Sequence, residues 1–132
     1  VAGSTTAVVS AVGIGWALGA EAETIRSLAP KSVTTPIAMG IADKIGGLAP
    51  LTAAFVIVTG IIGAISGAML FNALGVKDER ARGFAMGTAA HGIGTARAFQ
   101  EHEVAGTFSG VAMALNGIAT VIVLPLIWLI AA

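Results

Sequence analysis

The chain of 132 residues lacks cysteine altogether and holds little charge, and each shortage excludes a class of protein. Without cysteine the chain forms neither a disulfide bond nor a metal site built on thiolates. Charged residues make up 11% of the sequence, less than half of the roughly 25% that is usual in soluble proteins. Small soluble domains need many polar side chains, because much of their surface faces water. The composition, which is 56% hydrophobic, therefore predicts an integral membrane protein.

The few charges and the short motifs give no sign of nucleic-acid binding or of catalysis. Seven basic residues balance seven acidic ones, so no basic patch is expected for nucleic acid. Gly92–Thr95 lacks the Gly-Lys-Ser/Thr ending of a phosphate-binding loop, and Gly13–Gly15 has no preceding strand of the kind a dinucleotide fold requires. No combination of nucleophile, base and orienting residue stands out. We therefore expect no cofactor and no enzymatic activity.

Long uncharged stretches indicate where the chain crosses a membrane. Leu51–Leu74 and Ala105–Ala132 hold no charged residue over 24 and 28 positions, and a spanning helix needs roughly 20 residues. Val1–Ala20 is mostly apolar as well and long enough for one crossing. An all-α membrane protein with about three spanning helices is therefore expected. Gly63 and Gly67 have the spacing with which membrane helices pack closely.

Two apolar segments are interrupted by residues that do not suit a continuous helix, and the first is Pro30–Pro36. Both prolines lack the amide hydrogen that a helix interior uses, while Pro36 is well placed in the first turn of a short helix over Ile37–Ile45. A helix this short does not span about 30 Å of hydrocarbon, which predicts a re-entrant half-helix. The alternative is a surface connection with Lys31 among the lipid headgroups. The candidate binding residues of this break are Lys31, Ser32, Thr34 and Thr35.

The second interrupted segment is Gly83–Phe99, in which glycines are mixed with polar side chains. Glycines permit tight turns and a close approach of the backbone to a ligand, and ionisable residues at membrane depth are candidates for a function. The alternative is that the glycines only allow close helix packing, that His91 donates to a backbone carbonyl and that Arg97 pairs with Glu101. The candidate binding residues of this break are Thr88, His91, Gly94, Thr95 and Arg97.

Taken together, the two breaks predict a site for an anion. The free amide groups and the positive dipole end of a half-helix favour an anion, in particular a carboxylate. In transporters, broken segments at corresponding positions of two halves point to the binding site. An offset of 60 residues aligns Thr35 with Thr95, which is consistent with repeat halves 1–74 and 75–132. Asn116, in the last apolar stretch, either lines such a pathway or bonds to a neighbouring helix.

Both breaks also resemble motifs of one protein family. Leu28–Ala38, which reads LAPKSVTTPIA, is similar to the central motif of the LrgB/CidB family of bacterial membrane proteins. His91–Arg97 is similar to that family's Ser-His-x-x-Gly-Thr-Ala motif, although Ala90 stands in place of the serine. The similarity covers nearly the whole chain but only the C-terminal part of the family domain. It implies that residues 1–132 are one membrane domain, preceded in the longer protein by further helices.

The resemblance carries expectations about activity and location. The family was first described as antiholin-like, with a role in murein hydrolase control and cell lysis, and its members commonly work with a small LrgA/CidA-type membrane partner. It is also similar to the C-terminal domain of the plastid glycolate/glycerate translocator, and bacterial relatives are associated with pyruvate uptake. The resemblance thus implies a multi-pass protein of the bacterial inner membrane that transports small carboxylates.

Two functions therefore stay open on the sequence. In the first, a secondary transporter holds a glycolate-, glycerate- or pyruvate-like carboxylate between the two breaks, and His91 adds a donor that responds to protons. In the second, a holin- or antiholin-like component regulates murein hydrolase export and lysis, and copies of the chain assemble through Gly63 and Gly67. Saturable uptake of a substrate distinguishes the first function from the second.

Overall fold

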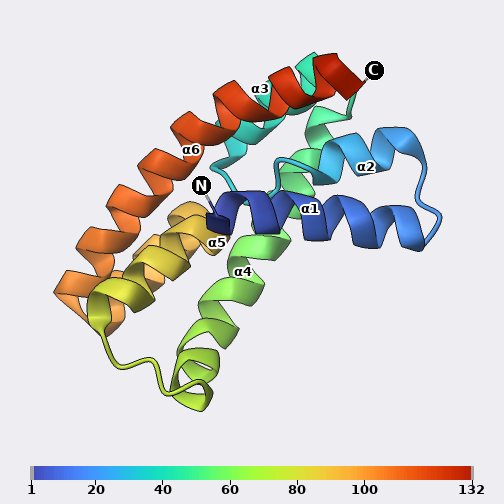
Figure 1. The fold of residues 1–132 in the computed structure, drawn as a ribbon. Coiled ribbons are helices and arrows are strands. Elements are labelled where there is room, and N and C mark those ends of the chain that lie inside the picture. The colour runs from blue at the N-terminus through green and yellow to red at the C-terminus, as the bar shows by residue number, and fades with distance from the viewer. Residues whose placement is uncertain (1, 132) are drawn as a thin grey trace.

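Helices account for nearly all of residues 2–131, the part of the chain that the computed structural model describes (Figure 1). No β-strand occurs within these residues, so the prediction of an all-α fold is confirmed. The helices are, in chain order, α1 (Ala2–Ala17), α2 (Ala22–Leu28), α3 (Thr35–Ile45), α4 (Ala49–Ala73), α5 (Glu79–Glu101) and α6 (Glu103–Ala131).

Two of these helices have the length and the apolar character of a membrane crossing. Helix α4 has 25 residues, and Glu103–Ile130 of α6 has 28. Their outward-facing side chains are large and apolar, as at Ile65 and Met69 on α4 and at Leu126 and Leu129 on α6. Such surfaces are stable against lipid and not against water. The protein is an all-α membrane protein.

Helix α1 is shorter than the crossing expected over Val1–Ala20. Its 16 residues cover roughly 24 Å at the usual helical rise, less than the hydrocarbon thickness of a bilayer. The helix ends because Gly19 adopts a left-handed φ of 73°, and the Ala20 amide donates to the Gly15 carbonyl at 3.0 Å. Two helices therefore meet the length of a crossing, where about three were expected. Val1 and Ala132, the outer ends of two predicted spans, lie outside the described residues.

The first break lies where it is predicted, between α2 and α3. Helix α3 begins at Thr35, has Pro36 in its first turn and runs for 11 residues. It ends at Gly46, whose φ of 78° is left-handed, in a turn closed by the Gly47 amide on the Ala42 carbonyl at 2.8 Å. The predicted short helix over Ile37–Ile45 is confirmed and is longer by two residues at its start. A buried apolar cluster surrounds the break: Ala29, Val33, Ala38, Ile41, Ile45, Val56 and Leu124.

The second break turns α5 into a helical hairpin. At His91 the backbone has φ 43° and ψ −133°, far from helical values. Gly94 then lies back against Met86, because a Cβ placed on Gly94 would sit 3.0 Å from the Met86 carbonyl oxygen. In a straight helix, residues eight positions apart are about 12 Å apart. In Figure 1 the two arms of α5 run side by side, and α6 continues from the second. The predicted break is confirmed, but its turn residue is a histidine and not a glycine.

The glycine face of α4 packs inside the chain. A Cβ on Gly63 would lie 2.5 Å from the Ala90 Cβ, and one on Gly67 would lie 2.3 Å from the Met86 Cε. Both contacts are with the first arm of the hairpin, residues 79–90. The expectation that Gly63 and Gly67 form a seam between copies of the chain is therefore wrong, because their faces are already covered by α5.

Candidate functional site

The first break forms a partly buried turn that is rich in polar groups. Lys31 is half-buried, and its Nζ donates to the Ser32 hydroxyl at 3.3 Å. Thr34 precedes α3 in an extended conformation, and its side chain makes no capping hydrogen bond. A threonine at this position ordinarily accepts a bond from one of the first helical amides. Thr34 and Thr35 therefore lie at a helix N-terminus where Thr34 does not cap the first amides, and helix N-termini favour anions.

Two residues that the sequence did not single out hold this break in place. Ser27, fully buried, accepts the Leu48 amide at 2.8 Å on its hydroxyl, and its carbonyl accepts the Thr52 hydroxyl at 2.9 Å. These bonds attach the end of α2 to the start of α4, so the α2 side of the break is fixed. The sequence signal for Ser27 and Thr52 was weak, because isolated hydroxyl residues are common in membrane helices. The residues bonded to Ser27 are also 21 and 25 positions away from it.

At the second break, the side chain of His91 points into the packing with α4. His91 is 3% exposed, and its Nε2 lies 2.9 Å from the Val56 carbonyl, to which it donates. Space for the ring exists because residue 60 is glycine: a Cβ there would lie 2.7 Å from the His91 Cε1. The interpretation in which His91 donates to a backbone carbonyl is therefore the arrangement that the structure shows.

Thr95 and Ser109 form a second buried polar contact, between the hairpin and α6. Their hydroxyl oxygens are 2.8 Å apart, and the Thr95 hydroxyl also lies 2.8 Å from the His91 carbonyl, to which it donates. Thr95 is 8% exposed and Ser109 is fully buried. The sequence signal for Ser109 was its spacing: beyond Thr107, the polar residues Ser109, Asn116 and Thr120 interrupt apolar sequence at intervals that place them on one helix face.

Asn116 lies between the two breaks. Its Nδ2 donates to the Ser32 carbonyl at 2.9 Å and to the Thr88 carbonyl at 3.1 Å. Of the two roles considered for Asn116, the hydrogen bond to neighbouring segments is therefore observed. It brings together three predicted site residues that are far apart in the sequence.

The remaining predicted residues are placed differently. Gly94 lies inside the hairpin, where its missing side chain leaves room for Ala90 and Met86. Arg97 lies on the surface of α5 and pairs with Glu101 at 3.0 Å, the ordinary contact between residues four positions apart on a helix. Within residues 2–131, no hydrogen bond or ion pair joins Gly94 or Arg97 to the first break.

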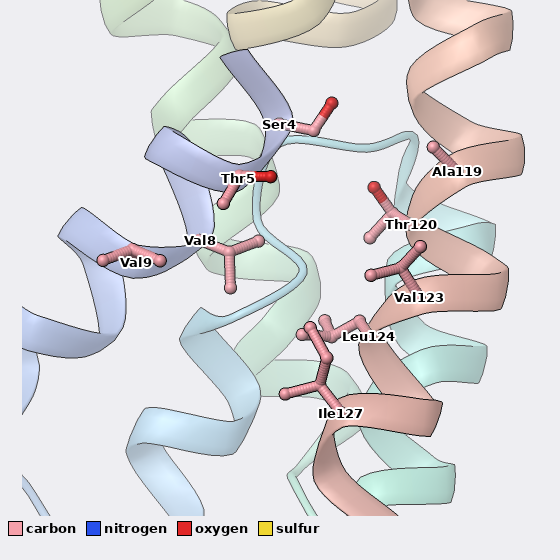
Figure 2. A pocket seen from close by; sticks show the side chains of 9 residues that line it. All are labelled: Ser4, Thr5, Val8, Val9, Ala119, Thr120, Val123, Leu124 and Ile127. Atoms are coloured by element: carbon pink, nitrogen blue, oxygen red, sulfur yellow. The ribbon is translucent and has the colours of Figure 1, made fainter. Parts of the chain in front are cut away.

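Two hollows adjoin this region on the side of α1. The larger has a volume of about 870 Å³ and lies between α1, the first arm of α5 and α6, with Ser4, Thr88 and Asn116 as its polar lining. The smaller, about 100 Å³, lies between α1 and α6 (Figure 2). In Figure 2, Ser4 and Thr5 face α6 at one end of it, whereas the other end is apolar. Both hollows are lined mainly by small or aliphatic residues.

Charged groups lie at the ends of the helices and not at the breaks, apart from Lys31. Asp78 precedes α5 and accepts the Arg80 amide at 2.8 Å. Its hydrogen bonds from Arg80 lower the pKa of the Asp78 carboxyl to about 2, and the same contact raises the pKa of Arg80. Within residues 2–131, no three acidic or histidine side chains converge in a way that could hold a metal ion.

The fold and the site thus define a helical membrane protein in which the hairpin at His91 is linked through Asn116 to the break between α2 and α3. The model of the LrgB-like family matches residues 1–130, and the chain belongs to that family. The uncharacterized protein YwbG of Bacillus subtilis is 43% identical over 123 residues, which are 93% of this chain and 55% of that protein. The holin-like protein CidB of Staphylococcus epidermidis is 35% identical over 85% of this chain and 49% of its own length.

A third relative, the antiholin-like protein LrgB of Bacillus mycoides, is 33% identical over 96% of this chain and 55% of its own length. The chain therefore spans about half the length of the curated relatives it matches. No solved structure gives a significant match. The resemblance noted from the two motifs is confirmed.

Proposed function

We propose that this chain serves in a holin- or antiholin-like membrane component that controls the passage of solutes across the bilayer. The names of two relatives, one holin-like and one antiholin-like, support this class. The observation that carries the proposal is a buried polar seam under an apolar exterior. Thr95, Ser109 and Asn116 place hydroxyl and amide groups between α5 and α6, and polar side chains within the membrane are candidates for a function.

In this proposal the protein is a multi-pass component of the bacterial inner membrane. It acts with further copies of itself and with a small LrgA/CidA-type membrane partner, as the family resemblance implies. The exposed apolar side chains of α4 and α6 supply a surface for lipid and for such partners. Because Gly63 and Gly67 are covered by α5, assembly uses other faces.

Release of trapped solutes from proteoliposomes tests this function. The full-length protein, with and without the small partner, is reconstituted around a series of solutes of increasing size. We expect release that rises linearly with concentration and ends at a size limit, since a pore shows no saturation. Uptake that saturates and selects carboxylates would contradict a pore.

A second candidate function is transport of small carboxylates of the glycolate, glycerate or pyruvate type. It is favoured by the start of α3, where Thr34 leaves the first amides without a side-chain cap and Lys31 lies in the same turn. Helix N-termini of discontinuous membrane helices bind anionic groups in transporters. In this function the hydroxyls of Ser32, Thr34, Thr35 and Thr95 hold the carboxylate, and His91 adds a proton-sensitive donor.

Uptake of labelled glycolate, glycerate and pyruvate into the same proteoliposomes tests the second function. Thr34→Val and Thr35→Val remove hydroxyls at the break and keep the size of each side chain. Thr107→Val is the matched control, because its exposed hydroxyl only donates to the Glu103 carbonyl of its own helix. We expect saturable uptake that the first two substitutions weaken about tenfold and the control leaves unchanged. Equal uptake by all three variants would exclude this site.

A further inference from the structure

Asn116 is the one side chain among residues 2–131 for which hydrogen bonds to both breaks are seen. Its acceptors, the carbonyls of Ser32 and Thr88, are 84 and 28 positions away in the sequence. The side chain is 4% exposed. An amide nitrogen carries two hydrogens, so these two bonds use all that the Asn116 nitrogen can donate.

Each break leaves a carbonyl group that needs a donor. Ser32 lies in the turn between α2 and α3, so its carbonyl is outside the regular hydrogen-bond pattern of a helix. Thr88 lies in the last turn before the reversal at His91, and the carbonyls of a final helical turn have no donor within the helix. An unpaired carbonyl at membrane depth is costly, because lipid offers no hydrogen bond in exchange. Asn116 pairs both carbonyls at once.

The position of α6 makes this link important. Within the described residues, α3 packs against α4 and α6, and α5 packs against α4 and α6, but α3 and α5 are not direct neighbours. Helix α4 reaches the two regions through separate residues, Thr52 on the side of α2 and Val56 on the side of His91. Asn116 differs from α4 because a single atom, its Nδ2, bonds to both breaks.

We propose that Asn116 is a latch that sets the spacing between the two breaks. Because one amide group makes both bonds, its rotation out of the seam releases the Ser32 turn and the end of the first hairpin arm together. Asn116 is then a positioning residue and not a ligand for a solute. Its Oδ1 already accepts the Thr120 hydroxyl at 3.4 Å. This role concerns the conformation of the chain itself and holds for a pore and for a carrier alike.

Pulsed electron paramagnetic resonance tests the latch without any substrate. The described chain has no cysteine, so spin labels are attached at Gly40→Cys on α3 and Ala96→Cys on the second arm, in the full-length protein with any other cysteine replaced by serine. A side chain at Gly40 meets nothing within 4 Å, and Ala96 is exposed. We expect one narrow distance distribution with Asn116 intact. With Asn116→Leu, which keeps the size and removes both donors, we expect a broader distribution or a second peak.

Amide hydrogen exchange in the same variants reports each break separately. With Asn116→Leu we expect about tenfold faster exchange in both segments 29–34 and 88–92, as for loss of a local hydrogen bond. Thr107→Val is the matched control on the same helix. Its exposed hydroxyl donates only to the Glu103 carbonyl of α6, so both Asn116 donors stay in place and wild-type exchange is expected. Acceleration in one segment alone, or in neither, would overturn the latch, as would the same acceleration in the control.

A second variant keeps the test decisive if Asn116→Leu does not fold. Asn116→Asp offers one donor at most, in its protonated form, so at least one of the two carbonyls loses its partner. We expect this variant to broaden the distance distribution less than leucine does where both fold. A wild-type distribution and wild-type exchange in Asn116→Asp would overturn the latch, whereas loosening of both segments supports it.

Discussion

The two breaks interrupt helices in physically different ways. The first extends over residues 29–34. Pro30 within it and Pro36 just after it lack an amide hydrogen, and hydrogen bonds of Ser27 with Leu48 and Thr52 hold its α2 side. The second takes a single residue, His91, while its neighbours keep helical geometry. Steric fit holds it: the hairpin closes because glycines admit the backbone of α6 and the ring of His91. Prolines and hydrogen bonds define the first break, whereas close steric packing defines the second.

The largest expected effect comes from the steric fit at the second break. A Cβ on Gly87 would lie 2.0 Å from the Ser109 carbonyl oxygen, whereas one on Gly92 would meet only the Met113 Sδ at 3.9 Å. We expect Gly87→Ala to lower the free energy of unfolding by about 3 kcal/mol or more, because backbone atoms must move. Thermal unfolding in mild detergent measures this.

Gly92→Ala is the matched control, five residues along the same hairpin. Alanine at an open helical position is expected to be neutral or about 1 kcal/mol more stable than glycine. Equal losses of unfolding free energy in Gly87→Ala and Gly92→Ala would show that the hairpin is sensitive to any added methyl group. The difference in space between the two positions would then not explain its stability.

The backbone at His91 predicts a reversed order of alanine and glycine. Its φ of 43° with ψ of −133° suits glycine and strains other residues. His91→Gly and His91→Ala both lose the bond to Val56, so their difference isolates the backbone. We expect the glycine variant to be more stable by about 1 kcal/mol.

At exposed Ala89, two residues earlier and within the helix, the order is the ordinary one, and Ala89→Gly is expected to cost about 1 kcal/mol. Chemical denaturation of the four proteins, wild type included, gives both differences. If alanine is the better residue at position 91 as well, the reversal of the chain lies elsewhere in α5.

A moderate effect is expected at the first break. Ser27→Ala removes the acceptor of the Leu48 amide, and we expect a loss of about 1 kcal/mol in the free energy of unfolding, typical of one hydrogen bond between membrane helices. Ser66→Ala is the control, since its hydroxyl donates only to the Ile62 carbonyl of its own helix. If Ser66→Ala loses as much stability as Ser27→Ala, the bond between Ser27 and Leu48 is not what stabilises this region.

The smallest effect concerns pH at the entrance of the hairpin. The folded-state pKa of Asp78 is lowered from 3.8 to about 2 by its hydrogen bonds with Arg80. Its carboxylate therefore stabilises the folded chain fully above the ordinary pKa, and the contribution is lost as the pH falls toward 2. We expect the melting temperature of the wild type to fall more between pH 4 and pH 2 than that of Asp78→Asn. If the melting temperatures of the two proteins fall in parallel as the pH is lowered, Asp78 does not contribute to the stability of the hairpin.

Much of the candidate site was recognisable from residue types, but not the partners of each residue. The motifs around Pro30–Pro36 and His91 were located correctly, since prolines, glycines and polar residues are unusual within apolar sequence. Whether His91 faces a solute or a carbonyl depends on Val56, 35 positions away. The same holds for Arg97, whose charge suited a ligand equally well before its pairing with Glu101 was seen.

By itself, the sequence determined the membrane class, the long helices α4 and α6 and the break before α3. Each follows from local properties: composition, the length of an uncharged run and the missing amide hydrogen of proline. Only the tertiary structure decided that the second turn is at His91 and that Gly63 and Gly67 face the hairpin. A positive φ is unfavourable for histidine by itself and is maintained here by the residues that pack around His91. The spacing of glycines predicts how closely helices pack, but it does not predict which helix is the partner.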